Sequence, residues 1–514
     1  MDYGESLQYL YSFVDWERGI GYGVNAPPRF TLDRIGALLR LLNNPQERFP
    51  SIHIAGSKGK GSTAAIIESV LRAAGLRTGL YTQPHLHTFR ERVRINNKPV
   101  SSQEFTRLVE RIVPAVDALK SDRPDLGDPT TYELATALGF LCFAEAAVDM
   151  AVVEVGLGGR LDATNVITPH VSVITSISLE HTAILGDTLD AIAREKAGIV
   201  KDNGVLVHAP NPANVTEVFR QTCLERRARI IAAEESRCEP ITPRGTPDYS
   251  ARACSNIHPH NEYGAGSEPV EGSSIHGSTG SPRTDYSEDS GQSAFPTANE
   301  AKPGWEFPVQ TCKIRVLEEE CVVRFPLRGR HQRTNLSVAL AVVDELAAQG
   351  LPLSSASVRA GIESVQWLGR FEHLSARPLV IADGAHTPDA MKHLRQTLAE
   401  HYPGRRIHCV LGTTQDKSVK QLLDVLVPAI ERLIVCRSRH PRAQEPRVIA
   451  AAAAGKVPIT QAESVEQAIS MGLDSMCSED VLCATGSLFV AAEAREAFGL
   501  AEFVDPPLDR RRKL

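Results

Sequence analysis

A loop rich in glycine and lysine, from Gly56 to Thr63, follows the short apolar run Ser51 to Ala55 and leads into a helical pattern. In a strand, loop and helix unit, glycines let backbone N–H groups close on phosphate oxygens, and the helix N-terminus favours an anion. Lys60 can reach the terminal phosphates of a bound nucleotide. The order of these elements predicts a phosphate-binding loop.

The spacing within this loop departs from the strict phosphate-loop pattern G-x-x-x-x-G-K-[ST]. Ile54 stands six residues before Lys60, and Gly61 separates Lys60 from Ser62. A surface turn that happens to be rich in glycine and lysine is the alternative interpretation.

Two polar residues close to other apolar runs could complete a nucleotide site. Glu154 stands near the end of the run Met150 to Val155 and is followed by a glycine-rich segment, and His181 comes after another such run. Ligands of open α/β sheets gather at the carboxyl ends of the strands, where a carboxylate can hold Mg²⁺. Either residue alone would more often be solvated or a cap, but their shared position favours a metal site.

The elements that must position these residues alternate between short apolar runs and longer helical patterns, which predicts parallel strands with crossover helices. A second alternating block starts at Leu379. The expected strands are Ser51 to Ala55, Thr78 to Tyr81, Met150 to Val155, Val171 to Ser176, Val205 to His208, Thr311 to Leu317, Glu320 to Phe325, Leu379 to Ala382, Ile407 to Leu411, Arg432 to Cys436 and Val481 to Ala484. The expected helices are Ser62 to Ala74, Ser102 to Leu119, Thr131 to Ala147, Thr188 to Ala197 and Arg333 to Ala348.

Residues 238–303 form a compositional break rich in Ser, Gly, Pro, Thr, Glu and Asn, with few apolar residues. Such a segment buries too little surface to offset its ordering entropy. We therefore expect a disordered insertion here, within the first of two α/β units.

Composition excludes several classes of function. The chain has 514 residues, 42% of them hydrophobic, and a formal net charge of -6. It has neither the basic field expected of a nucleic-acid-binding protein nor a run of about 20 apolar residues that would cross a membrane. With no visible signal peptide and ten cysteines that form no C-x-x-C pair, the expected location is the cytoplasm.

Nine motifs make the chain similar to the folylpolyglutamate synthases and dihydrofolate synthases, a branch of the Mur ligase superfamily, in which they occur in the same order. They are Gly56 to Thr63, Tyr81 to Leu86, Glu91 to Asn96, Val153 to Asn165, Glu180 to Gly186, Glu195 to Ile199, His331 to Asn335, Gly369 to Glu372 and Asp383 to His386. The resemblance implies an α/β fold class: an N-terminal P-loop-type parallel-sheet ATPase domain, residues 1–367, and a smaller Rossmann-like C-terminal domain, residues 368–514.

The function that the resemblance implies is ATP-dependent amide ligation, with ATP and Mg²⁺ as cofactors. ATP would phosphorylate a carboxylate of dihydropteroate or of a folate's glutamate tail, and the amine of L-glutamate would attack the acyl phosphate. The physical chemistry agrees, because a carboxylate is a poor electrophile until its oxygen becomes a leaving group. Phosphoryl transfer then needs mainly positioning and charge neutralisation. The resemblance also implies a monomer that binds small molecules.

The resemblance assigns a role to each matching position. Lys60, Lys196 and His386 would be catalytic, with Lys196 carried as a carbamate. The nucleotide would contact Ser57, Lys58, Gly59, Lys60, Gly61, Ser62, Asn335, Arg370 and Asp383. The pterin substrate would lie against Thr130, Thr131, Tyr132, Glu133, Leu161, Asp162 and Ala163. The metal would be held by Gln83, Glu154 and His181.

Two positions depart from the family pattern. Gln83 stands where the family usually has a serine that binds magnesium, although its side-chain carbonyl oxygen could replace the hydroxyl. Thr387 stands where an asparagine usually follows the segment Asp383 to His386.

Two alternative functions remain open at this stage. One is another Mur-type ligase that joins an amino acid to a different acid, although the phosphate loop begins too early for the extra N-terminal domain that would hold a nucleotide-sugar precursor. The other is a nucleotide-binding regulatory protein without catalysis. The presence of Glu154, His181, Lys196 and Asp383 speaks against the second.

Overall fold

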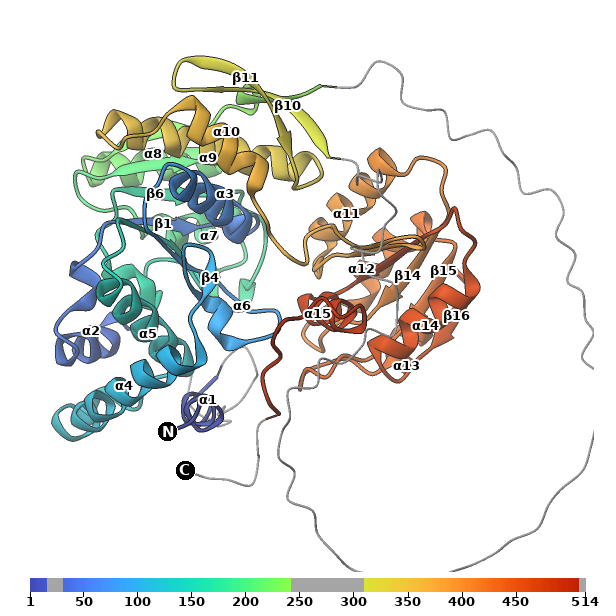
Figure 1. Cartoon of the computed structure of the whole chain (residues 1–514), viewed down its shortest axis with the longest axis horizontal. Helices are drawn as coiled ribbons and strands as arrows, with labels where there is room; N and C mark the ends of the chain where they lie inside the picture. The colour runs from blue at the N-terminus through green and yellow to red at the C-terminus, as the bar shows by residue number, and fades with distance from the viewer. Residues whose placement is uncertain (16–30, 242–308, 508–514) are drawn as a thin grey trace, which may run out of the picture.

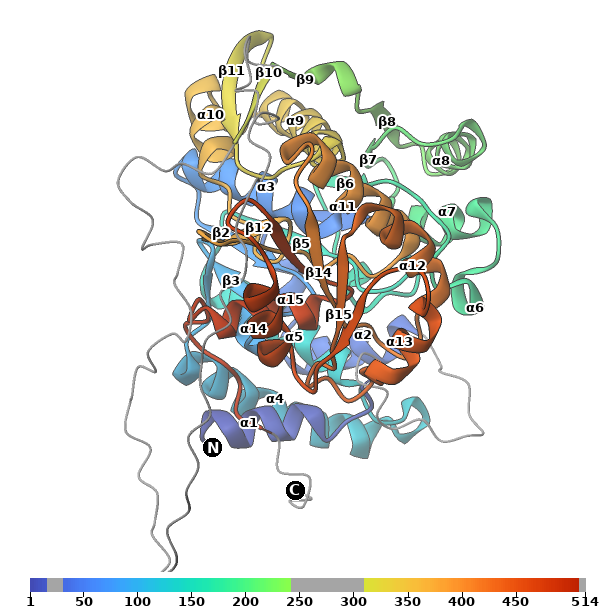
Figure 2. The same cartoon turned by 90° about the vertical axis from the view of Figure 1, so that its right-hand side faces the viewer.

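Two lobes, each built on a sheet with helices on both faces, make up the computed structural model (Figure 1). It describes residues 1–15, 31–241 and 309–507. The view turned by 90° shows the smaller lobe in front of the larger one (Figure 2). The expected fold class is confirmed, because both lobes alternate strands and helices around sheets that are mainly parallel.

The larger lobe carries an eight-stranded sheet. Six neighbouring strands are parallel, in the spatial order β2 (Thr78–Tyr81), β5 (Met150–Glu154), β1 (Ser51–Ala55), β6 (Val171–Ile174), β7 (Val205–His208) and β8 (Arg229–Ala232). The antiparallel pair β3 (Val93–Ile95) and β4 (Lys98–Pro99) extends the β2 edge. The central strands are buried on both faces, as parallel strands covered by helices must be.

Alternate residues of each strand face opposite helical layers. Ile52 and Ile54 of β1 pack with α3 (Lys60–Ala73), α9 (Arg330–Ala348) and α10 (Ser355–Ser364). The opposite face packs on two groups of helices. These are α1 (Tyr3–Tyr11), α2 (Leu32–Leu41), α4 (Ser102–Asp122) and α5 (Thr131–Glu145) on one side, and α6 (Thr182–Leu185), α7 (Leu189–Ala197) and α8 (Ala213–Glu225) on the other.

A three-stranded antiparallel sheet caps the α9 and α10 layer, in the order β11 (Glu319–Phe325), β10 (Gln310–Val316) and β9 (Cys238–Pro240). The expected start of the insertion at residue 238 is therefore wrong, because β9 pairs with β10 and Cys238 is buried. The sequence did not predict a strand at 238–241 because the residues with which it pairs lie some 70 residues further along the chain. The rest of the expected insertion, residues 242–303, lies outside the described residues.

The smaller lobe carries a six-stranded sheet, parallel except for one edge strand. Its order is β12 (Glu372–Ala376), β13 (Leu379–Ala382), β17 (Val481–Thr485), β14 (Ile407–Leu411), β15 (Arg432–Val435) and β16 (Ile459–Gln461). One face packs on α11 (Pro388–His401), α12 (Val419–Leu426) and α13 (Pro446–Ala453), and the other on α14 (Val465–Ser475) and α15 (Leu488–Ala497). None of the helices in the described ranges is long and apolar enough to span a bilayer.

The C-terminal segment after α15 returns to the larger lobe and reaches α1 (Figures 1 and 2). The Asp505 carboxylate accepts hydrogen bonds from the Tyr3 hydroxyl at 2.6 Å and from the Phe89 amide at 2.8 Å. The Asp505 amide donates to the carbonyl of His87 at 3.0 Å. The guanidinium of Arg90 lies over the ring of Phe503, 4.7 Å from its centroid.

Close packing of α10 on α3 gives the first testable prediction. A Cβ at Gly361 would lie 2.4 Å from the Cα of Val70, a backbone atom that cannot rotate away. We expect Gly361→Ala to lower the free energy of unfolding by about 1–3 kcal/mol through overpacking. Chemical denaturation checks this. The matched control is Gly36→Ala in α2, where the nearest atom lies 3.7 Å away and a gain of up to about 1 kcal/mol in helix propensity is expected. Equal stability of the two variants would contradict the packing argument.

Candidate active site between the two lobes

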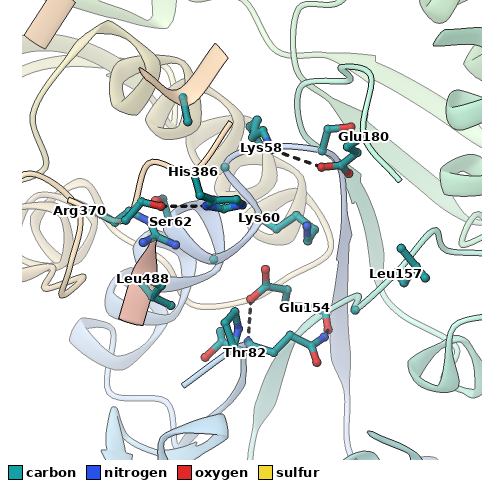
Figure 3. Close-up of a pocket in the computed structure, with 18 of the residues that line it drawn as sticks. Lys58, Lys60, Ser62, Thr82, Glu154, Leu157, Glu180, Arg370, His386 and Leu488 are labelled. Atoms are coloured by element: carbon teal, nitrogen blue, oxygen red, sulfur yellow. Dashed lines mark hydrogen bonds and ion pairs between the residues drawn. The ribbon is translucent and has the colours of Figure 1, made fainter. Parts of the chain in front are cut away.

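A cleft of about 1200 Å³ lies between the lobes, and both line it. Figure 3 shows Lys58, Lys60, Glu154 and Glu180 from the larger lobe facing Arg370, His386 and Leu488 from the smaller one. The predicted site residues that line the cleft are Ser57, Lys58, Gly59, Lys60, Gly61, Ser62, Gln83, Thr130, Thr131, Tyr132, Glu133, Glu154, Leu161, Asp162, Ala163, His181, Asn335, Arg370, Asp383 and His386. The remaining one, Lys196, lies just behind the wall.

The glycine- and lysine-rich loop forms the N-terminus of α3, which begins at Lys60, two residues earlier than expected. Gly59 is the N-cap, with a left-handed φ of 87°, and the first helical bond runs from the Thr63 amide to the Gly59 carbonyl at 2.9 Å. Three backbone N–H groups ahead of Thr63 therefore have no acceptor within the helix. With the helix dipole they make a site for an anion.

Neighbouring elements hold this loop from two sides. The amides of Ser57 and Lys58 both donate to the Ser176 carbonyl after β6, at 2.9 and 3.3 Å. On the other side Asn335 of α9 is buried, and its Oδ1 lies only 2.2 Å from where a Cβ of Gly59 would be. Asn335 therefore backs the loop, and a side chain at Gly59 would displace it.

Two lysines and a glutamate form a buried charge cluster beside the loop. The Glu180 carboxylate pairs with Lys196 Nζ at 2.9 Å and with Lys58 Nζ at 3.4 Å. Lys196 Nζ also donates to the Gly56 carbonyl at 2.9 Å, and Lys60 Nζ donates to the same carbonyl at 3.1 Å. Burial raises the pKa of Glu180, but the surrounding lysines, Lys196 foremost, outweigh it and bring the pKa to about 2.

Burial also lowers the pKa of Lys196 to about 8, although Glu180 opposes the shift. A neutral amine is therefore more accessible here than on a surface lysine. Our sequence reasoning missed Glu180 as a site residue. The signal was available, since Glu180 immediately precedes His181 after the β6 strand.

Glu154 and Gln83 meet at the carboxyl ends of β5 and β2. The main-chain N–H of Gln83 donates to Glu154 Oε2 at 3.1 Å, and Glu154 is almost wholly buried. Burial raises the pKa of Glu154 to about 6, and Lys60 and the main-chain N–H of Gln83 limit the rise. The side-chain oxygen of Gln83, Oε1, is buried and has no hydrogen-bond partner in the part of the chain that the structure describes.

These two groups fit a small divalent cation. An amide oxygen that has no hydrogen-bond partner within the described residues and a buried carboxylate that accepts from the same residue's main-chain N–H are hard oxygen ligands of the kind that Mg²⁺ prefers. The third expected ligand, His181, lies on the exposed edge of the same cleft, in a left-handed conformation with φ 47°. Within the described residues, three His, Cys, Asp or Glu side chains come together nowhere as a ready-made metal site.

The residues expected at the pterin end of the cleft form a hydrogen-bonded network. Glu133 makes a two-oxygen ion pair with Arg34 of α2, at 2.8 and 3.0 Å, and the Thr131 hydroxyl donates to the Leu10 carbonyl at 2.9 Å. The Glu133–Arg34 pair thus joins two elements that line the cleft, and Thr131 attaches α5 to α1. The Tyr132 hydroxyl bonds to Asp162 at 2.9 Å. Arg34 also lines the cleft and was not predicted, because its partner lies 99 residues away.

The smaller lobe contributes Arg370, Asp383 and His386. The Asp383 carboxylate accepts from the amides of Phe371 and Ala385 at 2.8 and 2.9 Å. Burial and then Lys58 lower the pKa of His386 to about 4, so the ring is neutral at pH 7. Because its Nδ1 faces the Gly384 carbonyl at 2.9 Å, Nδ1 must carry the hydrogen and Nε2 presents a lone pair.

Two further residues of the smaller lobe have structural roles. Glu372 forms its ion pair with Arg495 and not with Arg370, its near neighbour in the sequence. Thr387 stands where the family usually has an asparagine. Its hydroxyl caps α11 by accepting a hydrogen bond from the Ala390 amide at 3.3 Å.

Comparison with known proteins agrees with this architecture. Residues 54–222 match the Mur ligase middle domain, and residues 369–488 match the glutamate ligase domain of Mur ligases. A solved folylpolyglutamate synthase from Mycobacterium tuberculosis, complexed with ADP and AMPPCP, is 30% identical with a TM-score of 0.73, over 91% of this chain and 95% of that one. The fold and the cleft thus define an ATP-dependent ligase of the Mur type.

Relatives in sequence narrow the family further. The dihydrofolate synthase/folylpolyglutamate synthase of M. tuberculosis is 32% identical over 91% of this chain and 90% of that protein. A probable bifunctional folylpolyglutamate synthase/dihydropteroate synthase of Halobacterium salinarum is 34% identical over 96% of this chain, which spans only 51% of that relative's length. The chain belongs to the dihydrofolate synthase/folylpolyglutamate synthase family.

The tight contact between Gly59 and Asn335 gives the second testable prediction. Gly59→Ala places a Cβ 2.2 Å from Asn335 Oδ1 and strains the N-cap that orients the loop amides. We expect ADP affinity, measured by isothermal titration calorimetry, to fall about tenfold or more, since local strain of 1–3 kcal/mol corresponds to that range.

A second glycine separates backbone strain from the clash. Gly75 has the same φ of 87° as Gly59, yet a Cβ there would meet nothing within 4 Å. Gly75→Ala should therefore lower stability modestly and leave ADP affinity as it is. If Gly59→Ala binds ADP as tightly as Gly75→Ala does, the loop does not depend on this contact.

Proposed function

We propose that the chain joins L-glutamate to dihydropteroate, to the γ-glutamyl tail of reduced folates, or to both. A substrate carboxylate oxygen attacks the γ-phosphorus of ATP, ADP leaves, and the acyl phosphate is then attacked by the amine of glutamate. The amide forms, phosphate leaves, and the amine gives up a proton. One observation carries the proposal: the amide-lined N-terminus of α3 faces Arg370 and His386 across one cleft, as phosphoryl transfer followed by amine attack requires.

The phosphate end of the cleft supplies positioning and charge. The N–H groups of the loop and the ammonium of Lys60 would hold the phosphates, and Arg370 would approach them from the other lobe. Asn335 and Asp383 would contribute nucleotide contacts, Asn335 from behind the loop. His386 is neutral, and its Nε2 lone pair can accept a hydrogen bond or a proton from the attacking amine.

The residues present fit a resident Mg²⁺. Gln83 and Glu154 would hold it through oxygen, with His181 reaching in from the cleft edge. When bound, the cation neutralises charge that develops on the transferred phosphoryl group. Glu154 keeps its charge at neutral pH because its pKa is about 6.

The substrate end rests on the relatives' names and on the network around Tyr132 and Asp162. The M. tuberculosis relative carries both activities in its name, which supports dihydropteroate as well as folate tails. This chain matches only about half of the Halobacterium protein, and the second activity in that protein's name is not part of the proposal.

The setting of the enzyme is also a proposal. That the enzyme acts as a monomer is carried over from the family resemblance. The nine cysteines in the described ranges are free thiols, which supports a reducing cytoplasm. The net charge of -6 does not attract nucleic acid. Small anionic substrates would be bound by local basic residues such as Lys58 and Lys60. The domain boundary near residue 367 remains a prediction, consistent with matches that end at 222 and resume at 369.

The decisive experiment offers purified protein ATP, Mg²⁺ and labelled glutamate with dihydropteroate or tetrahydrofolate in separate reactions. Labelled product with one acid or both assigns the substrate. ADP release that depends on one of these acids, without transfer of glutamate, would point instead to another Mur-type ligase that uses a different amine. Nucleotide binding with no ADP release would support the non-catalytic alternative.

Lys60 provides the third prediction. Lys60→Ala should reduce turnover about 100-fold or more, the range seen when one transition-state donor is lost, while circular dichroism and the melting temperature stay unchanged. The matched control is Lys392→Ala, which removes an exposed lysine paired with Asp389 at 3.1 Å on α11. Near-normal turnover in Lys60→Ala would remove the phosphate-loop assignment.

Lys196 provides the fourth prediction, carbamylation by the addition of CO2 to its neutral amine with loss of a proton. Burial favours this reaction because it lowers the pKa of Lys196 to about 8. The competing interpretation is the plain ion pair with Glu180. Lys196→Ala should lose most activity and regain part of it with added acetate or propionate. An intact mass without the added CO2, measured in bicarbonate buffer, together with no rescue, would leave Lys196 as a structural ion-pair partner.

A further inference from the structure

The side chain of Gln83 is held by a chain of hydrogen bonds that starts at Thr164. Asp162 accepts from the Thr164 amide and hydroxyl, from the amides of Gly156 and Leu157, and from the Tyr132 hydroxyl. The Tyr132 oxygen in turn accepts from the Gly156 amide at 3.0 Å and lies 3.1 Å from Gln83 Nε2.

Counting donors and acceptors fixes the direction of this chain. Five N–H and O–H groups point at the Asp162 carboxylate, so it carries no proton of its own, and the single hydroxyl hydrogen of Tyr132 goes to it. The Tyr132 oxygen is therefore an acceptor toward Gln83. Only the NH2 end of the Gln83 amide can face it.

The second hydrogen of this NH2 group confirms the orientation. Gln83 Nε2 also lies 3.4 Å from the main-chain carbonyl of Glu154, which accepts only. A flipped amide would set its oxygen against two acceptors. The oxygen Oε1 must therefore lie on the opposite side, where it is buried and has no partner.

We propose that Tyr132 is a positioning residue for the cation site: its hydroxyl, held as an acceptor by Asp162, fixes the side-chain amide of Gln83 so that Oε1 keeps no hydrogen-bond partner among the described residues and can serve as a ligand of the same cation as Glu154. The inference rests on the proposed function, in which Gln83 and Glu154 hold the divalent cation. It adds that a longer side chain can serve at position 83 because a partner fixes its terminal amide. The same tyrosine lines the part of the cleft expected to hold the pterin, so it joins the metal end and the acid-substrate end.

The test measures how much Mn²⁺ tightens ADP binding, as the ratio of ADP dissociation constants without and with Mn²⁺, by calorimetry. This coupling is a binding quantity and needs no turnover. Tyr132→Phe removes only the hydroxyl. We expect the ratio to fall about tenfold, the lower end of the effect of removing a group that orients a metal ligand, with ADP affinity in the absence of Mn²⁺ unchanged.

A matched control and a double-variant cycle separate positioning from general damage. Tyr81→Phe removes another buried hydroxyl, one that bonds to Thr136 at 3.1 Å, and should keep the wild-type ratio. Gln83→Leu should lower the ratio as much as Tyr132→Phe does. The double variant should show no further loss, because the tyrosine acts only through the glutamine.

The outcomes distinguish two kinds of failure. If Gln83→Leu keeps the wild-type ratio, Gln83 is no ligand and the metal part of the proposed function fails. If Gln83→Leu loses coupling while Tyr132→Phe does not, or if the two losses multiply, the ligand stands and the positioning role is overturned. Should Tyr132→Phe fold poorly, anomalous scattering from Mn²⁺ in crystals of the wild-type ADP complex decides. Mn²⁺ bound to Gln83 Oε1, with Nε2 toward Tyr132, supports the proposal, and Mn²⁺ elsewhere overturns it.

Discussion

The site depends on unsatisfied backbone N–H groups at the start of α3, which must be kept close to other main chain and yet free of side chains. Gly59 meets this constraint through its left-handed conformation and its contact with Asn335. The Ser176 carbonyl fixes the preceding amides. The strand order brings these parts together. Because β1 lies between β5 and β6, the loops that follow β5 and β6 lie beside the loop between β1 and α3.

Charge balance is the second organising principle. Four ionisable groups, Lys58, Lys196, Glu154 and Glu180, crowd the loop with little solvent. Burial opposes ionisation of each one, and neighbours of opposite sign restore it to different extents. Glu180, enclosed by lysines, stays a carboxylate at any ordinary pH, whereas Glu154 titrates near 6. Two carboxylates in one cleft are thus given different chemistry by their surroundings.

Sequence reasoning predicted the elements of both sheets that have a strong local pattern. Nearly all the residues that the motifs singled out line one cleft. It failed where the signal is non-local. The strand at Cys238 forms by pairing with β10, which is distant in the sequence. Arg34 can be related to the site only through its ion pair with Glu133, which is also distant in the sequence. The orientation of Gln83 depends on Tyr132, 49 residues further along the chain, and through it on Asp162, a further 30 residues on. A single sequence gives the types of such residues but not their neighbours.

The segment around Asp505 has a mechanical consequence. It begins in the smaller lobe, yet it is bonded to Tyr3 and to the backbone at His87 and Phe89 in the larger one, so the covalent path between the lobes near residue 367 is supplemented by a second, noncovalent bridge at the other end of the chain. His87 of the larger lobe also contacts Glu496 and Arg495 of α15, each at 3.1 Å, so this end of the smaller lobe is attached at more than one point. A movement that separates α15 from the larger lobe must therefore break these bonds or bend the segment that follows the helix. Phe503 and Asp505 thus resist opening of the cleft, although neither of them lines it.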